Sequence, residues 1–107
     1  MTDATDHGTA RHGAHKTPGG KMVVVDFRVD GGVLRGVVVS GDFFLYPEEA
    51  IDPLTASLEG MPADRPAAEM ARAVAAAIPP GAELLGSSPE AVAEAVRRAL
   101  NPEPEEG

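Results

Sequence analysis

Hydrophobic and polar residues alternate over residues 21–29. The side chains on one side of this segment are all apolar: Val23, Val25, Phe27 and Val29. The residues between them are mostly polar or charged. An alternation of this kind is typical of a strand with one buried face. The sequence therefore predicts a half-buried strand here.

Residues typical of turns follow this strand at two places. The Asp-Gly-Gly of residues 30–32 indicates a hairpin, because the favoured two-residue turn needs positive φ at both central positions. A returning strand is predicted over 33–40, and its Val-Val-Val run at 37–39 indicates a central strand covered on both faces. Residues 41–42 (Gly-Asp) predict a tight turn or bulge into a short aromatic third strand at 43–46. Together the three strands make an antiparallel meander.

Helical spacing of apolar residues replaces the alternation after residue 46. The first helix begins near Pro47, whose fixed φ suits a first turn, and ends at Gly60. Asp64 is the predicted N-cap of the second helix, and Ser87 with Glu90 has the spacing of a capping box for the third. The predicted apolar stripes are Ile51, Leu54 and Leu58; Met70, Val74 and Ala77 or Ile78; and Val92, Val96, Ala99 and Leu100.

These elements predict an α+β fold, a three-stranded antiparallel β-meander with about three helices packed on one face. Residues 1–17 are polar, rich in Gly, His and Thr, and without an apolar period, so a disordered N-terminal tail is expected. Residues 101–107 are expected to form an acidic disordered tail. One domain, residues 18–100, is left to build the core.

Charge and composition exclude several classes of function. The chain of 107 residues has a formal net charge of −8, with 9 Lys and Arg against 17 Asp and Glu, and no basic stripe. Nucleic-acid binding is therefore not expected. There is no cysteine, which excludes disulfides and thiolate chemistry. The longest apolar runs are too short to span a bilayer, so we expect a cytoplasmic protein without a membrane partner.

Side chains suited to catalysis are scarce. His7, His12 and His15 all fall in the predicted tail, where a metal site would have no second shell of support, so we expect no metal site. Ser87 and Ser88 are interpreted as capping residues and not as nucleophiles, because no His or Lys lies near them in the sequence. We therefore expect a chain that is not an enzyme on its own.

Two lysines flank a glycine pair at residues 16–21. Lys16 and Lys21, around Gly19 and Gly20, could contact a phosphate, because glycine lets backbone N–H groups come close to an anion. The segment is not a P-loop, since the spacing differs and a strand follows. The other interpretation is a flexible segment leading into the first strand.

The segment from residue 40 to residue 49 is the most distinctive in the chain. Gly41 permits a backbone conformation closed to other residues, and Asp42 can cap the turn. Phe43 and Phe44 are adjacent in a predicted strand, so one ring should lie in the core and the other should point outward. The outward ring must be covered by the tail or by another protein.

These two segments carry a resemblance to a known family. Lys-x-Pro-Gly-Gly-Lys before a Val-rich hairpin, then Gly-Asp-Phe-Phe-Leu-x-Pro-Glu-Glu before an Ile/Leu helix, closely resembles the C-terminal accessory domain of lipoate–protein ligases. The resemblance is to the form in which that domain is a separate small subunit. It covers residues 16–100, and its most specific part is residues 41–49.

The resemblance implies a non-catalytic accessory subunit of a two-chain ligase. In such a heterodimer the catalytic subunit binds lipoate, ATP and magnesium, forms lipoyl-adenylate, and transfers the lipoyl group to lipoyl-acceptor domains. The accessory domain is needed for the activation step and binds no cofactor itself. This sequence has neither the Gly-Gly-Gly lipoate-binding loop nor the catalytic lysine motif of the large subunit. Lys16 and Lys21 would lie on the phosphate side of the partner's site. The implied partner-binding residues are Gly19, Gly20, Gly41, Asp42, Phe43, Phe44 and Pro47.

The alternative is a free-standing binding module. A small α+β adaptor or scaffold unrelated to lipoylation would also use an exposed aromatic strand. The family's fold is similar to that of iron–sulfur scaffold proteins, but those work through cysteines, which this chain lacks.

Overall fold

Two antiparallel sheets, three α-helices and one short 3₁₀ helix build the described part of the chain. The computed structural model describes residues 9–16 and 19–101. The chain runs through these elements: β1 (Thr9–Lys16), β2 (Met22–Asp30), β3 (Val33–Gly41), β4 (Phe44–Tyr46), the 3₁₀ helix η1 (Glu48–Ala50), α1 (Ile51–Leu58), α2 (Ala67–Ala77), β5 (Glu83–Leu85) and α3 (Pro89–Leu100). The first sheet has the order β1-β2-β3, and β4 and β5 form the second. The predicted α+β class is confirmed.

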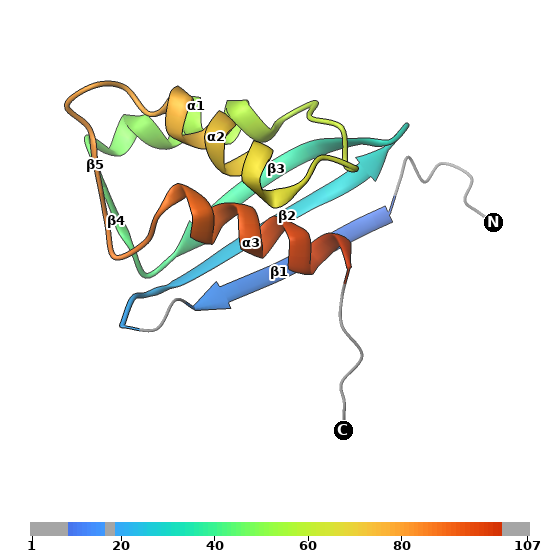
Figure 1. The fold of residues 1–107 in the computed structure, drawn as a ribbon, viewed down its shortest axis with the longest axis horizontal. Helices are drawn as coiled ribbons and strands as arrows, with labels where there is room; N and C mark the ends of the chain where they lie inside the picture. Colours follow the sequence, from blue (N-terminus) through green and yellow to red (C-terminus); the bar gives the residue numbers. More distant parts are fainter. Residues whose placement is uncertain (1–8, 17–18, 102–107) are drawn as a thin grey trace.

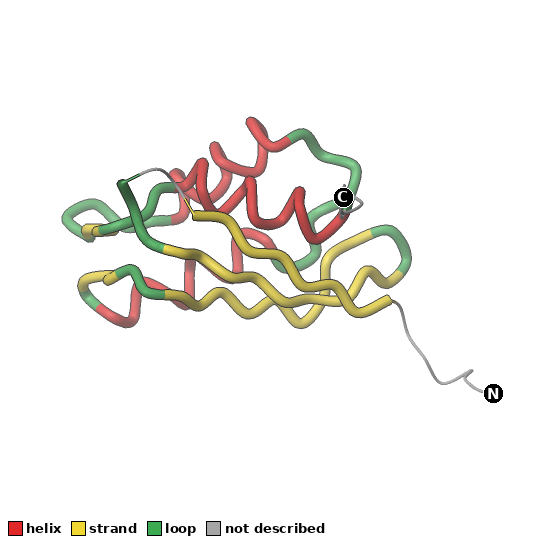
Figure 2. Tube along the Cα trace, turned by 90° about the horizontal axis from the view of Figure 1, so that it is seen from below, coloured by secondary structure: helices red, strands yellow, loops and turns green. Residues whose placement is uncertain are grey.

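The helices lie on one face of the three-stranded sheet, as expected (Figures 1 and 2). α3 packs against β1 and β2, α1 packs against β3, and α2 contacts both of these helices. No helix of residues 9–16 and 19–101 lies on the other face of the sheet. In the part of the chain described above, no helix has the length and apolar content needed to cross a bilayer.

The core lies between this sheet and the helices. β2 has the predicted alternation, with Val23, Val25 and Phe27 all buried. The predicted helical stripes also supply the core. Their fully buried members are Leu54, Leu58, Met70, Val74, Val92 and Val96. The hairpin between β2 and β3 turns through Gly31 and Gly32, both with positive φ, as predicted.

The N-terminal segment differs from the prediction. Residues 9–16 of the expected disordered tail form β1, which pairs antiparallel with β2 from Thr9↔Val29 to Lys16↔Met22. The sequence of β1 has no apolar alternation because α3 packs so closely on this strand that no space is left for a side chain at Gly13. A Cβ added to Gly13 would be 2.7 Å from the Ala99 backbone nitrogen and 2.8 Å from the Ala99 Cβ. The remainder of this expected tail and residues 102–107 lie outside the described residues.

The third strand of the predicted meander is also corrected. Residues 44–46 do not join β3; they form β4, which pairs with β5 from Phe44↔Leu85 to Tyr46↔Glu83. The third strand of the main sheet is β1 instead. β2 is therefore the central strand and β3 is an edge strand, so the prediction of a β3 covered on both faces is wrong: Val38 is 56% exposed.

Two predicted helix starts are shifted. Pro66, not Asp64, is the N-cap of α2, and no side chain caps that end. Ser88, not Ser87, caps α3: its Oγ accepts a hydrogen bond from the Ala91 backbone N–H at 3.1 Å. In both cases the N-cap is the residue directly before the first helical residue. The spacing of polar residues alone did not identify that position.

A β-bulge interrupts the β2–β3 ladder. The register shifts between Asp26 and Arg28, so that two residues of β3, Gly36 and Val37, lie opposite one residue of β2. Gly36 has φ of +66°, as this kind of bulge requires. The carboxylate of Glu59, at the end of α1, accepts hydrogen bonds from the Gly36 N–H at 2.9 Å and the Val37 N–H at 3.0 Å. One side chain thus ties the helix end to the bulge.

This arrangement predicts a pH-dependent contribution to stability. The backbone N–H groups of Val37 and then Gly36 lower the pKa of Glu59, helped by Arg35 and Arg28. A lowered folded-state pKa means that the contribution is complete above the unfolded-state value of about 4.3 and is lost as the pH falls through the folded-state value. Because the carboxylate is exposed, we expect Glu59→Gln to cost at most about 1 kcal/mol at pH 7.

Urea unfolding of both proteins at pH 7 and at pH 3 measures this contribution. The difference between Glu59→Gln and the wild type should shrink at pH 3. A difference that is the same at both pH values would contradict the role assigned to the carboxylate. Glu83→Gln, at an exposed carboxylate of β5 that lies in no helix, is the matched control.

Candidate partner-binding end

Three chain segments meet at the end of the molecule where β1 and β2 are joined (Figure 1). The Lys21 N–H donates to the Gly86 carbonyl at 2.8 Å, which connects the start of β2 to the segment after β5. The Asp42 N–H donates to the Met22 carbonyl at 3.0 Å, which connects β2 to the turn between β3 and β4. The two segments singled out in the sequence therefore lie together at one end.

Gly86 is a residue of this end that sequence reasoning missed. A Cβ there would be 2.8 Å from the Lys21 Cγ and 3.6 Å from the Phe43 Cα. The absence of a side chain lets Lys21 and Phe43 both lie close to this glycine. The available signal was the apolar pair Leu84-Leu85 in the short segment between Gly81 and Gly86, because a short run between turn residues is typical of a short strand.

Gly41 has a steric role at the same end. A Cβ at this position would overlap the Met22 carbonyl oxygen and approach the Val23 Cα to 3.0 Å. The chain can therefore leave the main sheet here and continue into β4. The predicted turn at Gly41-Asp42 is correct, although it leads into a different sheet.

Phe43 and Phe44 point in different directions, as predicted. Phe43 is half-buried and packs against the core, whereas Phe44 is 60% exposed. Phe44 is paired with Leu85, which is 46% exposed, and lies two residues from Tyr46, which is 55% exposed. These three side chains form an apolar patch on the β4–β5 ribbon, which we call the ribbon patch. Tyr46 and Leu85 were not among the predicted site residues.

A slot of about 370 Å³ lies between β3 and the β4–η1 segment. Its apolar residues include Val39 and Leu45, both buried, and the half-buried Ile51. Phe44 and Glu48 also line it. We call it the β3–β4 slot. An apolar floor beside exposed aromatic and acidic groups suits an apolar side chain that has a positive charge beside it.

The other predicted site residues lie near this end of the molecule. Lys16 ends β1 and is exposed, and Lys21 is exposed at the start of β2. Gly19 is exposed with φ of +76°, and Gly20 is partly buried. Pro47 is exposed and precedes η1; its carbonyl accepts from the Ala50 N–H at 2.9 Å.

The histidines do not gather into a site. His12 Nδ1 lies 2.6 Å from Asp26 Oδ1 on the sheet face opposite the helices, with both side chains largely exposed. His15 lies in the same strand, and His7 is outside the described residues. Within residues 9–16 and 19–101, no three or more His, Asp or Glu side chains are grouped so that they could hold a metal ion.

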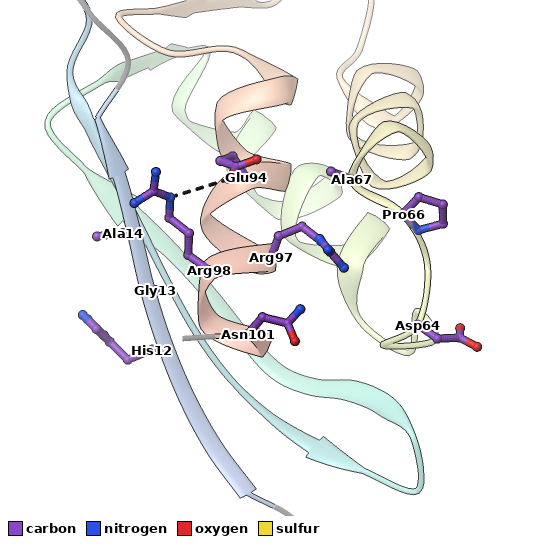
Figure 3. Close-up of a pocket in the computed structure, with 10 residues that line it drawn as sticks. All are labelled: His12, Gly13, Ala14, Asp64, Pro66, Ala67, Glu94, Arg97, Arg98 and Asn101. Atoms are coloured by element: carbon purple, nitrogen blue, oxygen red, sulfur yellow. Dashed lines mark ion pairs between the residues drawn. The ribbon is translucent and has the colours of Figure 1, made fainter. Parts of the chain in front are cut away.

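A second, larger cavity of about 890 Å³ is lined by the C-terminal part of α3, by β1 and by the start of α2 (Figure 3). It holds two cations, Arg97 and Arg98, but also two acids, Asp64 and Glu94. Arg98 Nε lies 3.6 Å from Glu94 Oε2. The charges balance, so this cavity does not favour an ionic ligand of either sign.

Comparison with known proteins gives one finding at the level of the fold. The chain is similar to a chain from an archaeal lipoylation system of Thermoplasma acidophilum, a structure of a bipartite lipoate protein ligase and its E2 lipoyl domain. The TM-score is 0.62, the identity is 23%, and the likeness covers 84% of this chain and 94% of that chain. The sequence matches no family model and no curated protein. The fold resemblance agrees with the family resemblance of residues 16–100.

Proposed function

We propose that this chain is the non-catalytic accessory subunit of a two-chain lipoate–protein ligase. It would act with a catalytic subunit in the ATP-dependent activation of lipoate to lipoyl-adenylate, for transfer to lipoyl-acceptor domains. Lipoate, ATP and magnesium would be bound by the catalytic subunit, and this chain would hold no cofactor.

The observation that carries this proposal is the shared fold with a chain of a bipartite lipoate protein ligase system. The sequence resemblance of residues 41–49 supports it independently. That segment includes the turn after β3, the exposed Phe44 and Tyr46, and η1, so the residues that carry the resemblance also form an exposed apolar surface. A surface of this kind is typical of a docking site on a protein.

The role of the chain would be conformational. A subunit that binds one state of its partner more tightly shifts the partner toward that state, by no more than the difference in its affinity for the two states. A tenfold gain in the activation step needs about 1.4 kcal/mol of such a difference. Burial of the ribbon patch can supply a free energy of this size.

The test combines the purified chain with the ligase catalytic subunit of the same organism, lipoate, ATP and magnesium. Lipoyl-adenylate, measured by mass spectrometry, should form only when both chains are present. Transfer from preformed lipoyl-adenylate should not need this chain. Adenylate formed at an unchanged rate by the catalytic subunit alone would contradict the proposal, as would adenylate formed by this chain alone.

A further prediction concerns Lys16 and Lys21, the only lysines in the chain. Both are exposed at the end that holds the ribbon patch, and lysine is a flexible point charge that suits a mobile phosphate contact. Lys16→Ala and Lys21→Ala should each lower the rate of adenylate formation at least about tenfold, or ~1.4 kcal/mol. Transfer from preformed adenylate should stay unchanged.

Separate assays of activation and transfer distinguish this role from others. Equal losses in both steps would indicate docking instead of a phosphate contact. Unchanged activation would assign the lysines to the other interpretation, solvated residues beside the β1–β2 connection. Arg72→Ala, at an exposed cation of α2, is the control for loss of positive charge elsewhere.

The ribbon patch also favours the second candidate, an adaptor that binds a protein unrelated to lipoylation. Two results separate the candidates. An adaptor would leave adenylate formation by the catalytic subunit unaffected, and it would not bind that subunit.

A further inference from the structure

β3 has one edge that faces away from β2, and the first half of this edge already has hydrogen-bond partners. Leu34 donates its N–H to the Met61 carbonyl at 2.9 Å and accepts from the Gly60 N–H at 2.7 Å. Gly36 and Val37 donate to the carboxylate of Glu59. From Leu34 to Val37 this edge is therefore covered by the end of α1 and the segment after it.

The second half of the same edge is open. The Asp42 N–H donates toward β2, and Ser40 and Val38 pair with β2 at Val24 and Asp26. In an antiparallel ladder the hydrogen-bonding groups of alternate residues point to opposite sides. Those of Val39 and Gly41 therefore point away from β2, and no described residue forms a backbone hydrogen bond with them on that side. Such an edge is a template for another extended chain.

The β3–β4 slot lies beside this open edge. Val39 and Gly41 themselves line the slot, so a strand paired with them could insert one of its side chains into it. The buried Val39 and Leu45 make the slot apolar. A sheet edge that supplies backbone hydrogen bonds and an adjacent pocket that selects a side chain are the two parts of peptide recognition by strand addition.

Charge specifies the peptide further. Glu48 lines the slot and is exposed. Asp42 and Glu49, next to slot residues in the chain, are also exposed, and the whole chain has a net charge of −8. The exposed rings of Phe44 and Tyr46 offer aromatic faces to a cation. An apolar residue with a neighbouring lysine or arginine matches these groups better than an acidic or neutral segment does.

We propose that an extended segment of the catalytic subunit pairs with Val39 and Gly41 and inserts an apolar side chain into the β3–β4 slot, with a lysine or arginine of the segment beside Glu48. This inference rests on the proposed function, because it names how that partner binds. It differs from docking on the ribbon patch alone in that it requires backbone hydrogen bonds along β3.

Amide hydrogen exchange, measured by NMR on the full chain with and without the catalytic subunit, tests the backbone pairing. The amides of Val39 and Gly41 should exchange at least about tenfold more slowly in the complex, which corresponds to ~1.4 kcal/mol of protection. The Leu34 amide, already bonded to Met61, is the internal control and should change little.

A charge reversal tests the selection of the segment. Glu48→Lys should weaken binding of the catalytic subunit at least about fivefold, whereas Glu69→Lys, at an exposed position of α2, should leave binding unchanged. Equal effects of the two substitutions would overturn the charge selection.

The outcomes separate this inference from the proposed function. If the complex forms and makes adenylate while Val39 and Gly41 exchange as in the free chain, strand addition is wrong and the accessory role stands. If the catalytic subunit neither binds nor needs this chain, both are overturned. Slow exchange at Val39 and Gly41 together with a loss on Glu48→Lys alone supports the inference.

Discussion

Gly13→Val is expected to destabilise the chain by about 3 kcal/mol, at the upper end of the range for overpacking and a large share of the stability of a small domain. The added side chain would meet the α3 backbone at the Ala95 carbonyl and at Ala99. Backbone cannot move aside as a flexible side chain can, so the helix and the strand must separate. Gly13 does not have a positive φ, and valine favours strands, so local preferences would act in the opposite direction.

Urea unfolding followed by circular dichroism measures this effect. Ala10→Val is the matched control, because Ala10 is an exposed residue of the same strand. We expect the control to unfold within about 0.5 kcal/mol of the wild type. A Gly13→Val protein as stable as the control would contradict the close packing of α3 on β1.

Phe44→Ala and Phe43→Ala are expected to separate binding from stability. Phe44 is 60% exposed, so its truncation should leave the fold intact and weaken binding of the catalytic subunit by about 1–3 kcal/mol, the scale of an interface anchor. Phe43 packs against the core but is only half-buried. Its truncation should therefore cost about 2 kcal/mol of stability, less than the ~3–5 kcal/mol of a fully buried phenylalanine.

Calorimetric titration with the catalytic subunit and urea unfolding of each variant give the two quantities. A Phe44→Ala chain that folds normally and binds with wild-type affinity would contradict the role of Phe44 as an interface anchor. The ribbon patch would then not be the docking surface. A large loss of stability in Phe44→Ala would instead show that its ring contributes to the core.

The sequence predicted the elements whose buried face has its own apolar pattern. The alternation of β2 and the stripes of the three helices are self-contained signals, because each apolar side chain must find a place in the core. The hairpin at Gly31-Gly32 is likewise a local signal of backbone conformation. These elements were found, but the helix starts are shifted: α1 begins at Ile51, after the short η1, and not near Pro47, and α2 and α3 begin one or two residues later than predicted.

The elements that were missed depend on contacts between distant segments. β1 has no apolar alternation because the backbone of α3 occupies the space where side chains would stand at Gly13. β4 left the meander because of the close approach of Gly41 to Met22, which depends on the register of β2 and β3. Only the pairing of β4 with β5 brings Leu85 to Phe44. No local pattern contains this information.

The contact of α3 with β1 joins the first described element of the chain to the last. β1 cannot bury its inner face until α3 has formed, since Gly13 packs against Ala95 and Ala99. A nascent chain on the ribosome therefore exposes the inner side of the sheet until α3 has emerged. Contacts of such long sequence separation also slow the search for the native state. We infer that the fold closes only after α3 has been synthesised, and that a chain shortened before Pro89 would be left as an incomplete and aggregation-prone sheet.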